Sequence, residues 1–233
     1  MGSRTFVALL LAAGRSTRFA KSLPKTWYEL GGAPVVVWSA RRLARLAGHR
    51  GTILATDEES IAARVPAVRR EFESANVVAT TLGGATRQES CRLAFEAAAT
   101  IDAELVLVHD AARPFFCLDA TITALEEAAE HGGAILGHRA RDTLKRVESG
   151  RVVRTIERDA VFHAATPQVF RRDAFEAMLA HARTHAIEGT DEAGLAEACG
   201  IPVVAIESPS TNIKITYPED ELVLPALASL LDE

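Results

Sequence analysis

The sequence is poor in the features that mark several large classes of protein. It contains three cysteines, Cys91, Cys117 and Cys199, which lie far apart and show no CxxC or Cys/His metal spacing. An odd number of distant thiols argues against a disulfide framework and indicates a reducing compartment, so we expect a cytoplasmic protein. Long apolar runs are missing too, since none approaches the roughly 18 residues that span a bilayer.

An excess of positive charge is also missing, because the chain of 233 residues carries a net charge of -5. This balance argues against a nucleic-acid polymer as partner, but it permits a small anionic ligand where cations cluster locally. Hydrophobic residues make up 48% and charged residues 24%, as in ordinary globular proteins. The length suits one α/β domain over residues 1–233, and no linker or repeat divides it.

Short apolar runs alternate with longer amphipathic runs along the first half of the chain. Strands are expected at FVALLL, TILAT, ANVVAT and AELVLVHD, and helices at residues 35–48, 58–72 (broken near Pro66), 87–99 and 117–133. This order predicts a mostly parallel sheet with helices on both faces. Ligands bind beyond the carboxyl ends of such strands, which places the loops after Leu11 and Val108 at the site.

The first apolar run also permits a second interpretation, as the core of a secretory signal. Ala12-x-Gly14 is an acceptable small-x-small cleavage site. However, Arg4 is the single basic residue before the run, and cleavage there removes the first strand of the alternating pattern. We therefore expect the segment to be retained as a buried strand.

Residues 137–160 show a different pattern. DTLKRV and RVVRTIE roughly alternate polar and apolar residues about the turn Glu148-Ser149-Gly150, as a half-exposed antiparallel ribbon does. A two-stranded arm is marginal in water on its own, so we expect it to pack on the body or on another subunit. The remaining elements are expected to be an extended HAATPQVF, helices over 172–185 and from Thr190, strands PVVAIE and NIKIT, and a last helix after Pro218.

The loop AAGRSTRFAKSLPK follows the first strand. Small residues at Ala12, Ala13 and Gly14 allow close approach of a ligand to backbone N–H groups. Four cations follow them, at Arg15, Arg18, Lys21 and Lys25. The combination suits a polyphosphate, although the loop is neither a Walker A motif nor a GxGxxG fingerprint. The alternative is a solvated basic surface loop.

The segment VLVHDAARPF ends a buried strand with an acid and then a cation. Asp110 is well placed to hold Mg²⁺, which prefers carboxylate and phosphate oxygens. Arg113 could contact a phosphate or Asp110 itself, and the alternative is a purely structural pair. His109 is interpreted as a strand-end histidine whose hydrogen bonds are satisfied.

Three further segments carry candidate residues. In LGGATRQES, Gly83 and Gly84 permit close approach, Ser90 could reach a base or sugar, and capping by Thr86 or Arg87 is the favoured interpretation. In TDEAGLAEACG, Thr190 is expected to be the N-cap, with Asp191 and Glu192 favourable to the helix dipole and no chemistry assigned. Lys214 in NIKIT points either outward or inward toward an anion.

No Ser/His/Asp triad or nucleophile elbow is apparent, so the chemistry indicated is charge neutralisation on phosphate.

These segments together closely resemble the 2-C-methyl-D-erythritol 4-phosphate cytidylyltransferase family of the non-mevalonate isoprenoid pathway. The resemblance lies in LLLAAGRSTRFAKSLPK, VLVHDAARPF, DTLKRV, HAATPQVF, TDEA and NIKITYPED, which occur in this order and span nearly the whole chain. The motif AAG…PK alone indicates only the wider group of sugar nucleotidyltransferases. The resemblance implies a Rossmann-like nucleotidyltransferase fold, a homodimer formed through the arm, and Mg²⁺ or another divalent cation.

The resemblance also implies a reaction and a set of site residues. CTP and the polyol phosphate would form 4-diphosphocytidyl-2-C-methyl-D-erythritol and pyrophosphate, by in-line attack and without a covalent enzyme intermediate. The implied catalytic cations are Arg18, Lys25 and Lys214; the CTP site is Ala12, Ala13, Gly14, Gly84, Ser90 and Asp110; Asp110 also serves the metal; and the polyol phosphate site is Arg113, Thr143, Arg158 and Thr166. Arg158 lies at the base of the arm, so it is expected to come from the other subunit.

Some features depart from the family pattern, and two other functions stay open. Thr26-Trp27 stands where the family often has Gln and an aromatic residue, and Thr211 precedes Asn212 where many members have an acidic or small residue. Neither touches the cations.

The first alternative function is a ribitol 5-phosphate cytidylyltransferase, against which HDAARP argues. The second is a nucleotide-binding regulator without turnover, against which Arg18, Lys25, Asp110 and Lys214 argue.

Overall fold

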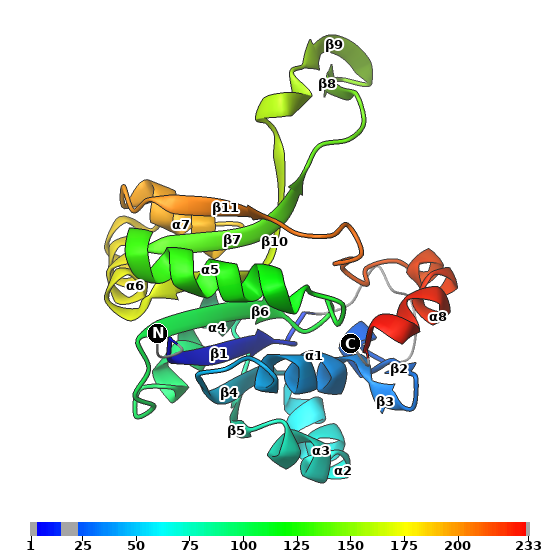
Figure 1. Ribbon diagram of the computed structural model, residues 1–233, viewed down its shortest axis with the longest axis vertical. Coiled ribbons are helices and arrows are strands. Elements are labelled where there is room, and N and C mark those ends of the chain that lie inside the picture. Colours follow the sequence, from blue (N-terminus) through cyan, green and yellow to red (C-terminus); the bar gives the residue numbers. More distant parts are fainter. Residues whose placement is uncertain (1–3, 15–22, 232–233) are drawn as a thin grey trace.

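The computed structural model describes residues 4–14 and 23–231, which form a seven-stranded sheet flanked by helices (Figure 1). The strand order is β11-β7-β10-β6-β1-β4-β5. These strands are β1 (Phe6–Leu11), β4 (His49–Thr56), β5 (Val77–Leu82), β6 (Leu105–Asp110), β7 (Gly133–Arg139), β10 (Phe162–Arg171) and β11 (Val203–Glu207). Two small ribbons, β2 (Glu29–Leu30) with β3 (Ala33–Pro34) and β8 (Leu144–Glu148) with β9 (Arg151–Ile156), stand apart from it.

The helices follow the predicted amphipathic runs. They are α1 (Val35–Ala44), α2 (Val65–Ala67), α3 (Arg69–Ser74), α4 (Arg87–Ala97), α5 (Leu118–His131), α6 (Arg172–His185), α7 (Glu192–Ala198) and α8 (Leu224–Leu227). A π-helical turn covers Ser60–Arg64, and 3-10 turns cover Lys25–Trp27, Arg158–Ala160, Pro218–Leu222 and Ala228–Leu231. Among the described residues, no helix has both the length and the apolar character required to cross a bilayer.

The sheet is mixed but mostly parallel, as predicted. β1 pairs in parallel with β4 and β6, β4 with β5, and β7 with β11, whereas β10 runs antiparallel to β6 and β7. From β1 the chain builds β4 and β5 on one side, and it then places β6 on the other side. The topology therefore switches between β1 and β6, and ligands of open α/β sheets bind at such a point.

The central strand β1 separates two layers of the core. Its residues Phe6, Ala8 and Leu10 pack in one apolar cluster with α1, α3 and α5. Its alternate residues Val7, Leu9 and Leu11 pack in a second cluster with α4, α6 and α7. All six residues are buried, which explains why this strand reads as a continuous apolar run rather than an alternating one.

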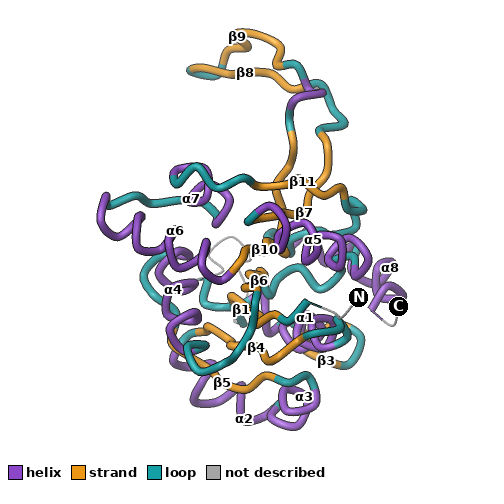
Figure 2. Tube along the Cα trace, turned by 60° about the vertical axis from the view of Figure 1, so that its left-hand side comes forward, coloured by secondary structure: helices purple, strands orange, loops and turns teal. Residues whose placement is uncertain are grey.

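The predicted ribbon is present as β8 and β9, and it stands away from the sheet as an arm (Figures 1 and 2). Ser149 and Gly150 both have positive φ values, 48° and 77°, which suits a two-residue hairpin turn. Val147 pairs with Val152 across the strands, and both side chains are exposed. The arm was expected to pack either on the body of its own chain or on another subunit. The body of the chain does not cover these two valines.

Four boundary predictions are wrong. Residues 212–216 form no strand, because this segment crosses the end of the sheet and pairs with no strand. Ile215 N donates to Ala112 O, whereas Asn212 N and Ile213 N donate to the nearby carbonyls of Pro209 and Thr211. The first helix ends at Ala44 rather than at Gly48. The cap of α7 is Asp191, not Thr190, since its carboxylate accepts from Gly194 N at 3.0 Å. The last segment is a 3-10 turn followed by the short α8 rather than one helix.

Candidate active site

A cavity of about 330 Å³ lies at the carboxyl ends of β1 and β6, at the switch point of the sheet. Its walls come from the ends of β1 and β6, residues 25 and 26, the loop after β5 with the start of α4, and residues 214–216. The lining residues are Leu11, Ala12, Ala13, Gly14, Lys25, Thr26, Gly84, Ala85, Thr86, Arg87, Ser90, Asp110, Ala112, Lys214 and Thr216. Three cations and one carboxylate are therefore present in the described part of this lining, an excess that favours an anionic ligand.

Most of the residues expected to contact nucleotide lie in this lining. They are Ala12, Ala13, Gly14, Lys25, Gly84, Ser90, Asp110 and Lys214. The sequence prediction that Lys25 and Lys214 share a cavity is confirmed, and of the two orientations left open for Lys214 the inward one is found. Arg15, Arg18 and Lys21 lie outside the described residues, so the predicted role of Arg18 stays a prediction.

The small-residue wall is shaped by hydrogen bonds at the start of α4. Thr86 caps this helix by accepting from Glu89 N at 3.1 Å. Ser90 Oγ donates to Thr86 O at 2.9 Å and accepts from Gly84 N at 3.0 Å, which fixes the loop between them. A side chain at Gly83 would collide with Ala13, so the glycine is required for close packing of the two loops.

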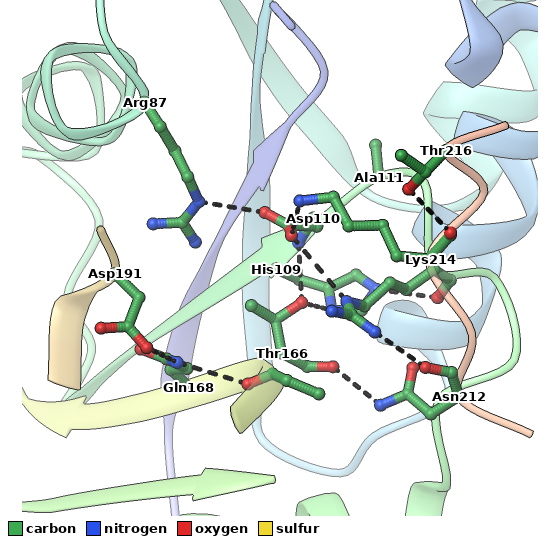
Figure 3. Close-up of polar contacts among 12 residues, drawn as sticks. Arg87, His109, Asp110, Ala111, Thr166, Gln168, Asp191, Asn212, Lys214 and Thr216 are labelled. Atoms are coloured by element: carbon green, nitrogen blue, oxygen red, sulfur yellow. Dashed lines mark hydrogen bonds and ion pairs between the residues drawn. The ribbon is translucent and has the colours of Figure 1, made fainter. Parts of the chain in front are cut away.

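Asp110 is the centre of the ion cluster in this cavity (Figure 3). Its Oδ2 accepts from Lys214 Nζ at 2.7 Å, and its Oδ1 accepts from Arg87 Nε at 3.2 Å. Arg113 Nε lies 3.8 Å from Oδ2. Burial alone raises the pKa of this carboxyl, but the three cations outweigh burial and hold it well below its usual range. Asp110 is therefore ionised at neutral pH and fixes the position of Lys214.

Sequence reasoning missed the place of Arg87 in the cavity lining and its pairing with Glu192. Both carboxylate oxygens of Glu192 accept from Arg87 Nη1, at 2.8 and 2.9 Å. The sequence did carry one signal for Arg87. It is a cation at the first position of a helix, where the helix dipole disfavours positive charge. Such a residue needs an acidic partner, and the sequence cannot show that this partner lies 105 positions away.

Arg113 and Thr166 lie behind the cavity rather than in its lining. Arg113 Nη1 donates to Asn212 O at 2.8 Å. Asn212 Nδ2 in turn donates to Thr166 O at 3.0 Å, as Figure 3 shows. Thr166 Oγ1 accepts from Asp110 N at 3.0 Å and lies 3.1 Å from His109 Nδ1. These bonds hold the backbone of Asp110 and the segment that carries Lys214.

The interpretation of His109 as a satisfied strand-end residue is confirmed. Its Nε2 lies 3.0 Å from Arg113 O, which assigns the proton to that nitrogen, and its Nδ1 then accepts from Thr166. Burial lowers the pKa of His109 to about 3, so the ring is neutral at pH 7.

The two arm residues expected to bind substrate lie apart from the cavity. Thr143 and Arg158 are exposed, and Arg158 Nη1 donates to Arg141 O at 2.8 Å. The cavity of one chain is lined without them. Their predicted role in binding substrate stays a prediction.

The described residues contain no cluster of three or more His, Cys, Asp or Glu side chains that could hold a metal ion. Asp110 is the one carboxylate in the described lining. A cation bound here therefore depends on oxygen ligands from a substrate, as Mg²⁺ often does.

A mostly parallel α/β sheet with a cation-lined cavity at its switch point is the architecture expected of a Rossmann-like nucleotidyltransferase. Comparison with known proteins makes this assignment more specific. The solved 2-C-methyl-D-erythritol 4-phosphate cytidylyltransferase from Thermus thermophilus matches 98% of this chain and 100% of its own, with 30% identity and a TM-score of 0.78. The family model for 2-C-methyl-D-erythritol 4-phosphate cytidylyltransferase (IspD) matches residues 6–228.

Curated relatives agree with the family model. The chain is 38% identical over 221 residues to the 2-C-methyl-D-erythritol 4-phosphate cytidylyltransferase of Cereibacter sphaeroides KD131, covering 93% of each. It is 34% identical over 229 residues to that of Geobacillus kaustophilus, covering 98% of this chain and 99% of the relative. The chain belongs to the IspD family, whose members are cytidylyltransferases of isoprenoid biosynthesis.

Proposed function

We propose that this chain transfers the cytidylyl group of CTP to 2-C-methyl-D-erythritol 4-phosphate. The products are 4-diphosphocytidyl-2-C-methyl-D-erythritol and pyrophosphate. The observation that carries the proposal is the placement of Lys25, Lys214 and Asp110 in one cavity with the small residues Ala12, Ala13 and Gly14. Family membership supplies the identity of the substrates.

The reaction needs positive charge and alignment more than it needs a protein nucleophile. An oxygen of the polyol phosphate attacks the α-phosphorus of CTP, and the bond from that phosphorus to the bridging oxygen breaks as pyrophosphate leaves. Lys25 and Lys214 neutralise the charge that spreads over the phosphate oxygens, as preorganised cations do in phosphoryl transfer. Arg18 is expected to act with them.

The small-residue wall is the expected site of the cytidine. Ala12, Ala13 and Gly14 continue β1, and a ligand can approach their backbone closely. Ser90 already bonds Thr86 and Gly84, so its hydroxyl shapes the base pocket in addition to any direct contact with cytidine. Substitution of Ser90 should therefore raise the KM for CTP more than it lowers turnover.

Asp110 fits the role of a Mg²⁺ ligand in this reaction. Mg²⁺ is commonly held by one or two carboxylates together with substrate phosphates. Asp110 supplies one ionised carboxylate in a cavity that otherwise carries cations, and we expect the triphosphate to supply the other oxygens. When bound, the metal neutralises phosphate charge and so lowers the barrier to attack.

The polyol phosphate site is expected to combine two chains. Arg113 and Thr166 support the cavity from the body, while Thr143 and Arg158 lie on the arm. The exposed valines Val147, Val152 and Val153 give the arm an apolar surface that water solvates poorly. We therefore propose a homodimer formed through the arms, in which Arg158 of each chain serves the cavity of the other.

Mixing two inactive variants tests this arrangement. Lys25→Ala damages the cavity of its own chain, and Arg158→Ala damages the cavity of its partner. A dimer of one of each then retains one intact cavity, so mixing and re-equilibration should restore activity to about a quarter of the wild-type level. No restoration after mixing means that Arg158 acts within its own chain or not at all.

We also propose that the protein works in the cytoplasm. The described residues contain three free thiols, with Cys91 buried and no disulfide among them. This usage is typical of a reducing compartment. Labelling of the intact cell with a thiol reagent that cannot cross membranes should leave Cys117 and Cys199 unmodified.

A pyrophosphate-release assay with CTP tests the proposed activity. We expect turnover with 2-C-methyl-D-erythritol 4-phosphate and much slower release with ribitol 5-phosphate. Faster release with ribitol 5-phosphate would reassign the substrate. Binding of CTP by calorimetry with no release from either polyol phosphate would instead favour the nucleotide-binding regulator. Lys25→Ala is the matched control, because it should retain the fold and lose turnover.

A further inference from the structure

Glu192 is a buried acid that the proposed reaction does not use directly. Its side chain retains 2% of its surface, and it does not line the cavity. Its partner Arg87 does line the cavity, and the two join helices α7 and α4 through a charged pair. The fully buried Cys91 lies close to both, and burial raises the pKa of its thiol, so it stays uncharged at neutral pH.

The pair continues into the ion cluster without a break. Arg87 Nε donates to Asp110 Oδ1 at 3.2 Å, and Lys214 Nζ donates to Asp110 Oδ2 at 2.7 Å. Figure 3 shows the side chains of Arg87 and Lys214 approaching Asp110 from opposite sides. Four side chains on four segments thus form one series: Glu192, Arg87, Asp110 and Lys214.

The helix dipole favours an acid at position 192, but it does not require that acid to be buried. Asp191 already caps α7, and its carboxylate is the group that accepts from Gly194 N. Docking of the helix is explained by Ala193, Leu195 and Ala196, which are buried in the apolar cluster with β1 and α6. A carboxylate buried next to these residues costs stability unless it is paired. Neither capping nor docking of α7 therefore accounts for Glu192, and the effect of its pairing with Arg87 has to be sought in the cavity.

We propose that Glu192 is a positioning residue for the transferase reaction, because it anchors Arg87 and thereby leaves one oxygen of Asp110 to hold Lys214 in the cavity. This inference rests on the proposed function. Arg87 Nη2 has no hydrogen-bond partner in the described part of the chain. Once Glu192 loses its charge, Arg87 is able to turn and bind both oxygens of Asp110 in a bidentate pair. Lys214 then loses its anchor without any change in the residues that touch substrate.

The first test compares two charge-removing variants on the same helix. Glu192→Gln keeps the size of the side chain, and Glu197→Gln makes the same change at an exposed position of α7. We expect Glu192→Gln to lower kcat by about tenfold or more, as loss of an orienting partner does in other sites, with the KM of both substrates changed by less than about threefold. Glu197→Gln should match the wild type. Wild-type kcat in Glu192→Gln overturns the inference while leaving the proposed function intact.

A double-mutant cycle separates positioning from a general loss of structure. In the background of Arg87→Gln there is no cation for Glu192 to hold, so adding Glu192→Gln should change kcat by less than about twofold. If Glu192→Gln lowers kcat by the same factor in both backgrounds, Glu192 does not act through Arg87 and the inference fails. Thermal unfolding of each variant shows whether the fold has been lost instead.

A measurement that needs no turnover reports on Lys214 directly. The chain has four lysines, Lys21, Lys25, Lys145 and Lys214, so reductive ¹³C-methylation gives a simple NMR spectrum, with Lys214→Arg assigning the relevant signal. We expect the Lys214 signal of the ligand-free protein to shift in Glu192→Gln and to stay unchanged in Glu197→Gln. An unchanged Lys214 signal in Glu192→Gln overturns the inference even if the wild type proves inactive with the proposed substrates.

Discussion

Two regions of this molecule contain ion pairs of the same length in very different surroundings. Arg146 and Glu148 approach to 2.7 Å on the arm, and Lys214 and Asp110 approach to 2.7 Å in the cavity. The arm side chains retain 54% and 55% of their surface, whereas Lys214 retains 36% and Asp110 retains 10%. Water therefore screens the first pair more than the second, so distance alone does not measure what an ion pair contributes.

The regions also differ in how each side chain is supported. In the cavity, Asp110 has contacts from α4, from the 212–216 segment and from Thr166 on β10. On the arm, Arg146 and Glu148 both lie on β8 and pair with each other in exposed positions. The charged centre of the cavity is therefore supported by several segments of one chain, whereas the charged pair on the arm has little support from the rest of the chain.

The largest expected effect follows from removing the central charge of the cavity. Asp110→Asn leaves Arg87, Arg113 and Lys214 close together with less negative charge to balance them. We expect the free energy of unfolding to fall by about 3 kcal/mol in urea denaturation at pH 7.5. Glu148→Gln on the arm is the matched change, and it should alter stability by less than about 0.5 kcal/mol. Equal effects from the two variants would remove the distinction between the two regions.

Replacement of a cavity lysine should have the next largest effect, on turnover rather than on stability. Lys25→Ala should lower kcat by about 10²–10³, as loss of one well-placed donor typically does, with little change in thermal unfolding. Arg18→Ala should behave in the same way. Lys145→Ala on the arm is the control, since Lys145 Nζ donates to Thr155 Oγ1 on the neighbouring strand. Near-normal turnover in Lys25→Ala would remove this residue from the mechanism.

A smaller effect is the loss of folding stability at acid pH, which we expect from two histidines in the body of the fold. Burial lowers the pKa of His109 to about 3 and that of His49 to about 4. The unfolded chain takes up these protons near pH 6.5, before the folded chain does, so stability is complete above pH 6.5 and falls as the pH drops toward 4. We expect a slope of about 2–2.5 kcal/mol per pH unit near pH 5.5 in urea denaturation, because the unfolded chain then binds almost two more protons than the folded chain.

A variant assigns this slope to the histidines. His49→Gln can still bond Thr52, which lies 2.9 Å from His49 Nε2, but it cannot take up a proton. The slope should therefore fall by roughly half, since one of two titrating groups has been removed. A flat stability profile between pH 6.5 and 5 in the wild type contradicts the prediction.

Much of the fold follows from local pattern, and the exceptions have a physical cause. The strand Phe6–Leu11 and the helix Arg172–His185 were predicted with their observed bounds, because burial on both faces and helical periodicity leave clear signals. Ile213 and Ile215 alternate with Lys214 as a strand does. They instead face an apolar cluster with Phe115 and Leu224, while Lys214 turns into the cavity. Alternation reports which side is buried, not whether a neighbouring strand is present.

The candidate site was predictable where its residues follow strand ends, as Ala12 and Asp110 do. Parallel topology brings such positions to one edge, so their proximity could be expected. The pair of Arg87 and Glu192 could not be found in this way, because each lies at a helix start that was explained by capping alone. Their contact depends on the docking of α7 beside α4, which neither local sequence reveals.

The smallest expected effect is the coupling energy of the ion pair on the arm, which compares directly with that of the ion pair in the cavity. A double-mutant cycle on Arg146 and Glu148 should give a coupling energy of about 0.5 kcal/mol or less, because both side chains are solvated and lose entropy on pairing. The corresponding cycle on Lys214 and Asp110 should give a value several times larger at the same distance. Salt provides the internal check, since about 0.5 M NaCl should abolish the first coupling and preserve most of the second. A large, salt-resistant coupling on the arm would mean that the arm pair is buried against a second chain in solution.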